Sequence, residues 1–272
     1  MYLNYWHLEN MPFENKPTPR FFYCSSQHEE ALARLEYVVT QKKQLALITG
    51  EYGSGKTMLA HMLREKLSAG QYHFIYAGNP FFNANDLLHY LLQLLIVPGG
   101  SIEKVPENKI DALHLFTEIL RRNRQINKHT VIIFDETHLI SDIRVFEEIR
   151  VLLNFTFDNN YDLTLILLGQ SEVREKIAQL PQFKQRINFQ YHLQALSEGE
   201  VGAYLQHRLK VSGHKDGDVF LPEAVHEIFI NSHGLSRTIN NIADVCLMVG
   251  LDKHSSHITA EIARAALDEV LL

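Results

Sequence analysis

Blocks of apolar residues alternate with helical patterns along the first 195 residues of the chain. Five short apolar-rich runs are typical of strands in a parallel sheet, some of them apolar at every position as buried strands are. These runs cover residues 45–49, 74–77, 131–134, 163–169 and 189–192. Apolar residues recur at helical spacing between the runs. The helical segments cover residues 29–40, 57–68, 85–95, 110–126 and 145–155. This order predicts βαβ units, and therefore a parallel sheet covered by helices on both faces.

Only helical signals remain toward the C-terminus. Ser197 and Glu200 have the spacing of a capping box and predict a helix to about residue 212. Pro222 can begin a second helix, because the first helical position tolerates a missing N–H. A third helix is expected at residues 236–249, and Thr259 is expected to cap a fourth.

Two domains follow from this change of pattern. We expect an α/β domain with an N-terminal extension at residues 1–195 and a small all-helical lid domain at residues 196–272. Residues 97–109 contain two prolines and two adjacent glycines, and are expected to form an irregular connection.

A phosphate-binding loop is the clearest motif. Residues 50–57 (GEYGSGKT) match G-x-x-x-x-G-K-[ST] in full, after an apolar run and before a helical pattern. Its backbone N–H groups can converge on a phosphate, with Lys56 reaching the β- and γ-phosphates and the Thr57 hydroxyl binding Mg²⁺. The chain is therefore predicted to bind ATP with Mg²⁺. The expected nucleotide-binding residues are Gly50, Glu51, Tyr52, Gly53, Ser54, Gly55, Lys56, Thr57 and Met58.

Paired carboxylates follow the third predicted strand. Asp135 and Glu136 come directly after residues 131–134, at the edge where parallel sheets bind their ligands. Asp135 is then the expected Mg²⁺ ligand of a Walker B motif, and Glu136 the candidate base that polarises the attacking water. A solvated helix start is the plain alternative for such a pair.

Composition narrows the class further. Of the 272 residues, 46% are hydrophobic and 21% are charged, as in ordinary soluble proteins. No segment is long and apolar enough to predict an integral membrane span, and no secretion signal is found. The two cysteines are not at metal-binding or redox spacing, which suits the cytosol, so we expect a cytoplasmic protein. The formal net charge of −6 does not indicate a nucleic-acid surface, although it does not exclude one.

Seven further motifs are spread along nearly the whole chain. They are residues 5–13 (YWHLENMPF), 17–23 (PTPRFFY), 28–35 (HEEALARL), 168–170 (LGQ), 185–187 (QRI), 191–193 (YHL) and 234–240 (GLSRTIN). Together they resemble the ExeA family, the general secretion pathway protein A group of AAA+ ATPases, which includes MshM-like pilus proteins. The resemblance implies an α/β P-loop NTPase core followed by a helical lid. The AAA+ regulators of Tn7-like transposons share this architecture.

The resemblance also implies roles for four polar residues. Gln170 looks like a sensor 1 residue, and Arg237 resembles a sensor 2 arginine that binds the γ-phosphate from the lid. Arg186 is the candidate arginine finger, with Lys184 close enough to compete for this role. Each role has a plain alternative. Gln170 can be a turn residue at the end of a strand, Arg237 a surface arginine, and Arg186 part of a solvated basic loop.

We therefore expect an AAA+ ATPase that forms a ring or helical homo-oligomer and acts on a partner protein. Its first expected use is as an accessory ATPase for assembling secretion or pilus machinery. The alternative is an ATP-dependent, double-stranded-DNA-binding regulator of transposition that recruits a transposase; DNA contacts would then come from Lys42, Lys43, Lys128 and the basic group at residues 121–124. The acidic charge favours the first use; the absence of the membrane span and peptidoglycan-binding domain of full-length secretion members favours the second. A nucleotide-dependent switch with vestigial hydrolysis is a third possibility, against which the Asp135-Glu136 pair argues.

Overall fold

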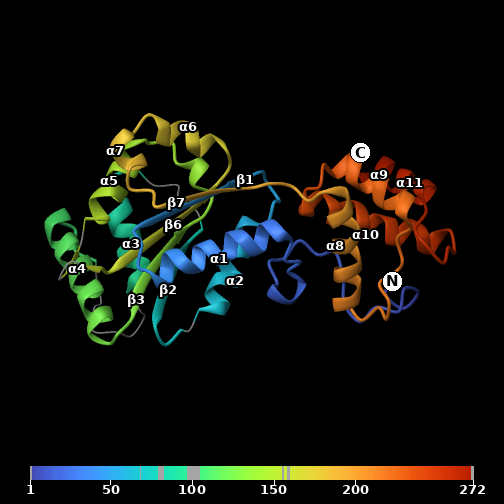
Figure 1. Cartoon of the computed structure of the whole chain (residues 1–272), viewed down its shortest axis with the longest axis horizontal. Helices are drawn as coiled ribbons and strands as arrows, with labels where there is room; N and C mark the ends of the chain where they lie inside the picture. Colours follow the sequence, from blue (N-terminus) through green and yellow to red (C-terminus); the bar gives the residue numbers. More distant parts are fainter. Residues whose placement is uncertain are drawn as a thin grey trace. The chain divides into compact units, whose positions relative to one another are not determined.

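A computed structural model describes residues 2–67, 69–78, 83–96, 105–154, 156–157 and 160–270. The chain forms two compact units (Figure 1). The α/β unit contains the described parts of Glu30–Gly50 and Leu59–His192, and the helical unit contains those of Met1–Glu29, Glu51–Met58 and Leu193–Leu272. Each unit is built around its own buried apolar cluster.

A five-stranded sheet forms the centre of the α/β unit, with strand order β2-β3-β6-β1-β7. The strands are β1 (Leu45–Gly50), β2 (Tyr72–Ala77), β3 (His129–Phe134), β6 (Leu163–Gly169) and β7 (Phe189–Leu193). The pairs β1–β6, β3–β6 and β2–β3 are parallel. All residues of β1, β3 and β6 are buried, as expected for strands covered on both faces.

Helices cover the sheet on both sides in Figure 1, with α1 and α2 on one side and α3, α4 and α5 on the other. Their bounds are α1 (Ser26–Thr40), α2 (Lys56–Lys66), α3 (Leu87–Leu95), α4 (Lys109–Gln125) and α5 (Arg144–Leu152). Alternate strand residues such as Leu47, Phe134 and Leu167 join Phe116 of α4 and Phe146 of α5 in one buried cluster. Burial of these side chains contributes about 1.5–3 kcal/mol each.

The predicted fold class is confirmed, and all five predicted strands occur. The prediction did not include α6 (Glu172–Ala178), α7 (Pro181–Lys184) or the two-residue strands β4 (Thr156–Phe157) and β5 (Asn160–Tyr161), which pair antiparallel. Most of the irregular connection expected at residues 97–109 lies outside the described residues, as do the expected helix ends at Ser68 and Phe155.

Four helices make up most of the helical unit. They are α8 (Glu198–Val211), α9 (Pro222–Ser232), α10 (Ser236–Asp252) and α11 (Ala260–Val270). Ser197 and Glu200 form the predicted capping box, and Pro222 occupies the first turn of α9, where no N–H is needed.

The N-terminal segment packs inside the helical unit. Tyr2, Trp6, Leu8 and Phe13 belong to its buried cluster, and the Trp6 indole N–H donates to the carbonyl oxygen of Leu247 at 2.9 Å. From the sequence, this segment is expected to be an extension of the α/β domain. The structure groups it with the helices because its aromatic residues are buried among them, a contact between residues about 240 positions apart.

A buried arginine fixes the rest of this segment. The Arg208 guanidinium donates to the carbonyl oxygens of Pro12 and Glu14, and lies 4.8 Å from the centre of the Phe21 ring. Such cation–π contacts are stronger when desolvated. Among the described residues, no helix is long and apolar enough to cross a membrane.

Candidate nucleotide-binding site

The phosphate loop leaves the carboxyl end of β1, where Gly50 is the last strand residue. Gly53 and Gly55 have φ angles of +83° and +97°, a region that residues with a Cβ rarely adopt. The Ser54 hydroxyl between them is buried and has no hydrogen-bond partner within the described chain. A buried polar atom of this kind requires a partner, and a phosphate oxygen is a suitable one.

His28, at the start of α1, holds the loop from one side. Its Nε2 lies 3.1 Å from the carbonyl oxygen of Ser54 and its Nδ1 lies 2.6 Å from the Ser25 hydroxyl. Because the carbonyl can only accept, Nε2 carries the hydrogen and Nδ1 accepts from Ser25. Burial lowers the pKa of His28, which favours this neutral form. A Cβ on Gly55 would lie 2.7 Å from Nε2, so the close approach requires glycine.

The start of α10 holds the loop from another side. The Ser236 hydroxyl donates to the carbonyl oxygen of Gly53 at 2.5 Å, and a Cβ on Gly53 would meet the Cβ of Arg237 at 2.9 Å. The Arg237 guanidinium lies 4.3 Å from the centre of the Tyr52 ring and donates to its hydroxyl. The structure thus brings the expected sensor 2 residue to the phosphate loop, on an aromatic residue of the loop itself.

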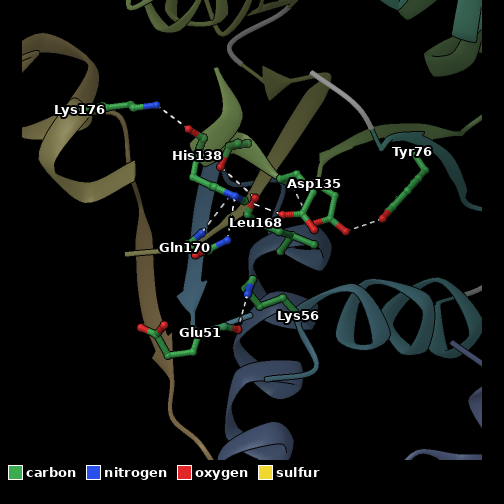
Figure 2. A network of polar contacts seen from close by, with 10 residues as sticks. Glu51, Lys56, Tyr76, Asp135, His138, Leu168, Gln170 and Lys176 are labelled. Carbon is green, nitrogen blue, oxygen red and sulfur yellow. Dashed lines mark hydrogen bonds and ion pairs between the residues drawn. The ribbon is translucent and has the colours of Figure 1, made fainter. Parts of the chain in front are cut away.

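The remaining residues of the motif have distinct positions. The Lys56 side chain is 6% exposed, and its ammonium donates to the carbonyl oxygen of Glu51 at 2.8 Å (Figure 2). Thr57 and Met58 continue into α2 and are partly buried, whereas the Glu51 side chain is exposed. A buried ammonium at the first turn of a helix suits an anionic ligand.

Strand order brings three distant parts of the sequence to one edge of the sheet. Strand β6 lies between β1 and β3, with Gly169 opposite Thr49 and Leu167 opposite Phe134. The carboxyl ends of these parallel strands therefore meet at one edge. Gln170 and the pair Asp135-Glu136 follow the ends of neighbouring strands.

Asp135 is 2% exposed and lies in a polar environment. One carboxylate oxygen accepts from the backbone N–H of Glu136 at 2.8 Å, and the other accepts from the Tyr76 hydroxyl (Figure 2). Glu136 has a φ of +53°, an uncommon value outside glycine, and its side chain is 31% exposed. Backbone strain of this type occurs at functional sites.

A histidine connects the two predicted catalytic side chains. His138 Nδ1 lies 3.4 Å from a carboxylate oxygen of Glu136, and His138 Nε2 lies 2.9 Å from the side-chain nitrogen of Gln170 (Figure 2). The sequence patterns did not indicate a role for His138, for Tyr76 or for the contact of His28 with the loop. The one available signal for His138 was its place two residues after the Asp135-Glu136 pair.

Arg186 lies away from this edge. It follows α7 and precedes β7, and its guanidinium donates to the side-chain oxygens of Gln44 at 3.3 Å and Asn154 at 2.7 Å. Gln44 directly precedes β1, so Arg186 lies near the amino end of that strand. The competing Lys184 is exposed at the end of α7.

The donor groups fit ATP and Mg²⁺ chemically. The loop offers an unpartnered buried hydroxyl and two glycines in the left-handed region, beside a buried ammonium. The Thr57 hydroxyl and the Asp135 carboxylate are hard oxygen ligands, which Mg²⁺ prefers. Among the described residues, no group of three or more His, Cys, Asp or Glu could hold a metal.

Fold and loop together define a P-loop nucleotide-binding protein, and the family comparison agrees. The model of the AAA domain family matches residues 39–177, about half of the chain, so the chain belongs to this family. The chain is also 32% identical over 276 residues to general secretion pathway protein A of Aeromonas hydrophila. This similarity covers 98% of the chain and 48% of the relative, and confirms the resemblance seen in the motifs. The chain thus spans about half the length of that relative.

Solved structures with the same fold have low sequence identity to the chain. The ORC2 protein of Aeropyrum pernix, solved as ADPNP-ADP complexes, has a TM-score of 0.72 and 17% identity, over 96% of this chain and 72% of that one. The RuvB Holliday junction branch migration motor of Thermotoga maritima has a TM-score of 0.59 and 15% identity, over 89% of this chain and 67% of that one.

Proposed function

We propose that the chain is an AAA+ ATPase that binds ATP with Mg²⁺, hydrolyses it at a subunit interface and recruits or remodels a partner protein. The buried Ser54 hydroxyl, without a partner inside a complete phosphate loop, is the observation that carries the proposal. Lys56 and the loop N–H groups bind the phosphates, and Thr57 and Asp135 hold Mg²⁺, which neutralises phosphate charge when bound. Glu136 polarises the attacking water, and Gln170 and Arg237 detect the γ-phosphate.

Lys56→Ala should abolish measurable ATP binding, because a buried ammonium that faces the phosphates is lost. Hydrogen bonds to charged groups contribute about 1.5–3 kcal/mol each, so the loss of contacts to both the β- and the γ-phosphate should lower affinity about a hundredfold or more. Fluorescence anisotropy with a labelled ATP analogue measures this directly. Lys66→Ala is the matched control, since Lys66 lies on the same helix, half-exposed and paired with Glu36. Equal affinity of wild-type and Lys56→Ala protein would contradict the proposal.

The position of Arg186 supports a shared active site. Gln44 directly precedes β1 and Gly50 of the phosphate-loop motif ends it, and a strand of six residues spans about 20 Å. The position of Arg186 beside Gln44, at the opposite end of β1 from Gly50, supports a role at the nucleotide of another subunit. We propose a ring or helical homo-oligomer on this ground.

The similarity to general secretion pathway protein A supports an accessory role in assembling secretion or pilus machinery. Full-length relatives continue beyond the matched region, so this partner assignment is a proposal for the ATPase region alone. A cytoplasmic location stays a prediction.

A second candidate function is ATP-dependent binding of double-stranded DNA as a regulator of transposition, and one observation favours it. Lys42 and Lys43 precede β1 and Lys128 precedes β3, so the parallel sheet brings them to its amino edge. His129, the first residue of β3, is buried near these lysines. Its burial and then the Lys42 charge lower its pKa to about 4. Arg122 and Arg124, of the group at residues 121–124, are already paired with Glu118 and Asp162.

DNA binding, if it occurs, should depend on ATP and on salt. Each lysine is a weak site, so ATP-driven assembly must align many copies for measurable affinity. Because phosphate contacts release counterions, affinity should fall by about 10³-fold or more between 50 and 200 mM salt. Anisotropy of a labelled duplex with a non-hydrolysable ATP analogue tests this, with Lys42→Gln/Lys43→Gln as the edge variant and Lys66→Gln as the control. Without binding at about 50 mM salt, secretion or pilus assembly is the working function.

A further inference from the structure

A chain of polar contacts joins the ends of β3 and β6. Glu136, His138 and Gln170 lie in sequence along it, with separations of 3.4 Å between Glu136 and His138 and 2.9 Å between His138 and Gln170. The backbone N–H of Gln170 also lies 3.4 Å from His138 Nδ1. The His138 side chain is 13% exposed, so water has little access to it. Figure 2 shows the imidazole between the end of β3 and Gln170.

The His138 imidazole faces polar groups with both of its nitrogen atoms. Nδ1 lies 3.4 Å from the Glu136 carboxylate, which can only accept, and at the same distance from the backbone N–H of Gln170, which can only donate. Nε2 lies 2.9 Å from the side-chain nitrogen of Gln170 and accepts from it in the tautomer that carries the hydrogen on Nδ1. The imidazole thus contacts both the carboxylate and the amide.

The turn that carries His138 is fixed from two directions. The Thr137 hydroxyl donates to the carbonyl oxygen of Leu168 on β6 at 2.9 Å. The Lys176 ammonium on α6 donates to the carbonyl oxygens of His138 and Ile140. A Cβ on Gly169 would lie 2.6 Å from the Thr137 hydroxyl, so β6 approaches the turn too closely for any residue but glycine. With its backbone held, the imidazole keeps its place between the two side chains.

We propose that His138 is a positioning residue for ATP hydrolysis, which couples Gln170 to the proposed base Glu136. This inference rests on the proposed ATPase function. Contact of Gln170 with the γ-phosphate of bound ATP shifts its amide, and His138 passes that shift to the Glu136 carboxylate. The base is then aligned with the attacking water only when ATP is present. Misplacement of a reacting group by about 1 Å costs about a hundredfold in rate, so even a small shift matters.

Three variants of His138 and one double variant test the coupling. We expect His138→Ala to lower kcat about tenfold to a hundredfold with unchanged ATP affinity. His138→Asn should recover part of the rate, because its amide can replace Nδ1 beside Glu136, and His138→Gln should recover less. In His138→Ala/Gln170→Ala protein the losses should not multiply, because the second substitution acts on a coupling already broken. Steady-state turnover and nucleotide anisotropy of the full chain give both quantities.

Controls separate this inference from the function on which it rests. Wild-type turnover is measured first, because its absence would refute the proposed ATPase function. A kcat of His138→Ala protein within twofold of wild type would refute the role of His138 and leave the proposed ATPase function standing. Losses of kcat that multiply fully in the double variant would do the same. Thermal unfolding is followed in parallel, and His138→Asn carries the test if His138→Ala does not fold. His226→Asn is the matched control, since His226 is exposed on α9 and pairs with Glu198.

Discussion

Glu136→Gln protein should bind ATP normally and lose nearly all turnover. The amide has the shape of the carboxylate but cannot polarise water as a base, and general-base contributions are about 10²- to 10⁴-fold. Glu136 is partly exposed at the carboxyl edge of the sheet, so the substitution leaves no buried charge unpaired. A coupled phosphate-release assay gives the rate, and anisotropy gives the affinity.

Glu148→Gln is the matched control for this variant. Glu148 of α5 pairs with Lys109 of α4 at 2.9 Å, and its substitution should leave turnover unchanged. Wild-type turnover by Glu136→Gln protein would remove Glu136 from the mechanism. A parallel loss of ATP affinity would instead show that the carboxylate acts in binding.

Arg186→Ala protein should bind ATP but hydrolyse it about 10³- to 10⁵-fold more slowly, as expected for loss of an arginine supplied by a neighbouring subunit. Arg186 lies near the amino end of β1 and Gly50 of the loop motif lies at its carboxyl end, so the substitution should not change the subunit's own ATP affinity. Lys184→Ala is the competing variant, because both side chains lie near the start of β7. If Arg186→Ala loses more turnover than Lys184→Ala, Arg186 is the arginine finger. If Lys184→Ala loses more, Lys184 supplies the cation in its place.

Mixing variants tests whether the cation acts across an interface. Arg186→Ala protein retains an intact phosphate loop, and Lys56→Ala protein retains Arg186, so mixed assemblies contain some complete sites. Activity should therefore reappear in the mixture and vary with its composition. A mixture that forms assemblies by light scattering yet shows no activity at any ratio would exclude an in-trans role.

The sequence predicted those parts of the fold that short stretches of chain determine by themselves. The strand β3 and the phosphate loop could be read directly, because a buried parallel strand is apolar throughout and the loop has fixed spacing. Helices α6 and α7 were missed because seven and four residues are too few to show a helical period. The predicted boundary at residue 195 could not reveal where the N-terminal segment packs, since Trp6 meets Leu247 only after folding.

The site shows the same division. The types and spacing of Lys56 and Asp135 indicated their chemistry, and these roles stay predictions until tested. The contact between His138 and Gln170 depends on β6 lying beside β3, which no local pattern specifies. The contact of His28 with Ser54 likewise joins residues 26 positions apart.

The contacts of the phosphate loop also bear on how this chain can be divided. The segment recognised as an AAA domain, residues 39–177, contains the complete loop motif. Yet His28 lies before this segment, and Ser236 and Arg237 lie after it, and these side chains hold Gly53 and Ser54 in place. A fragment of residues 39–177 would contain the whole loop motif but would lack His28, Ser236 and Arg237, which contact the loop. In this protein the segment that the family model matches is therefore shorter than the set of residues that shapes the phosphate loop.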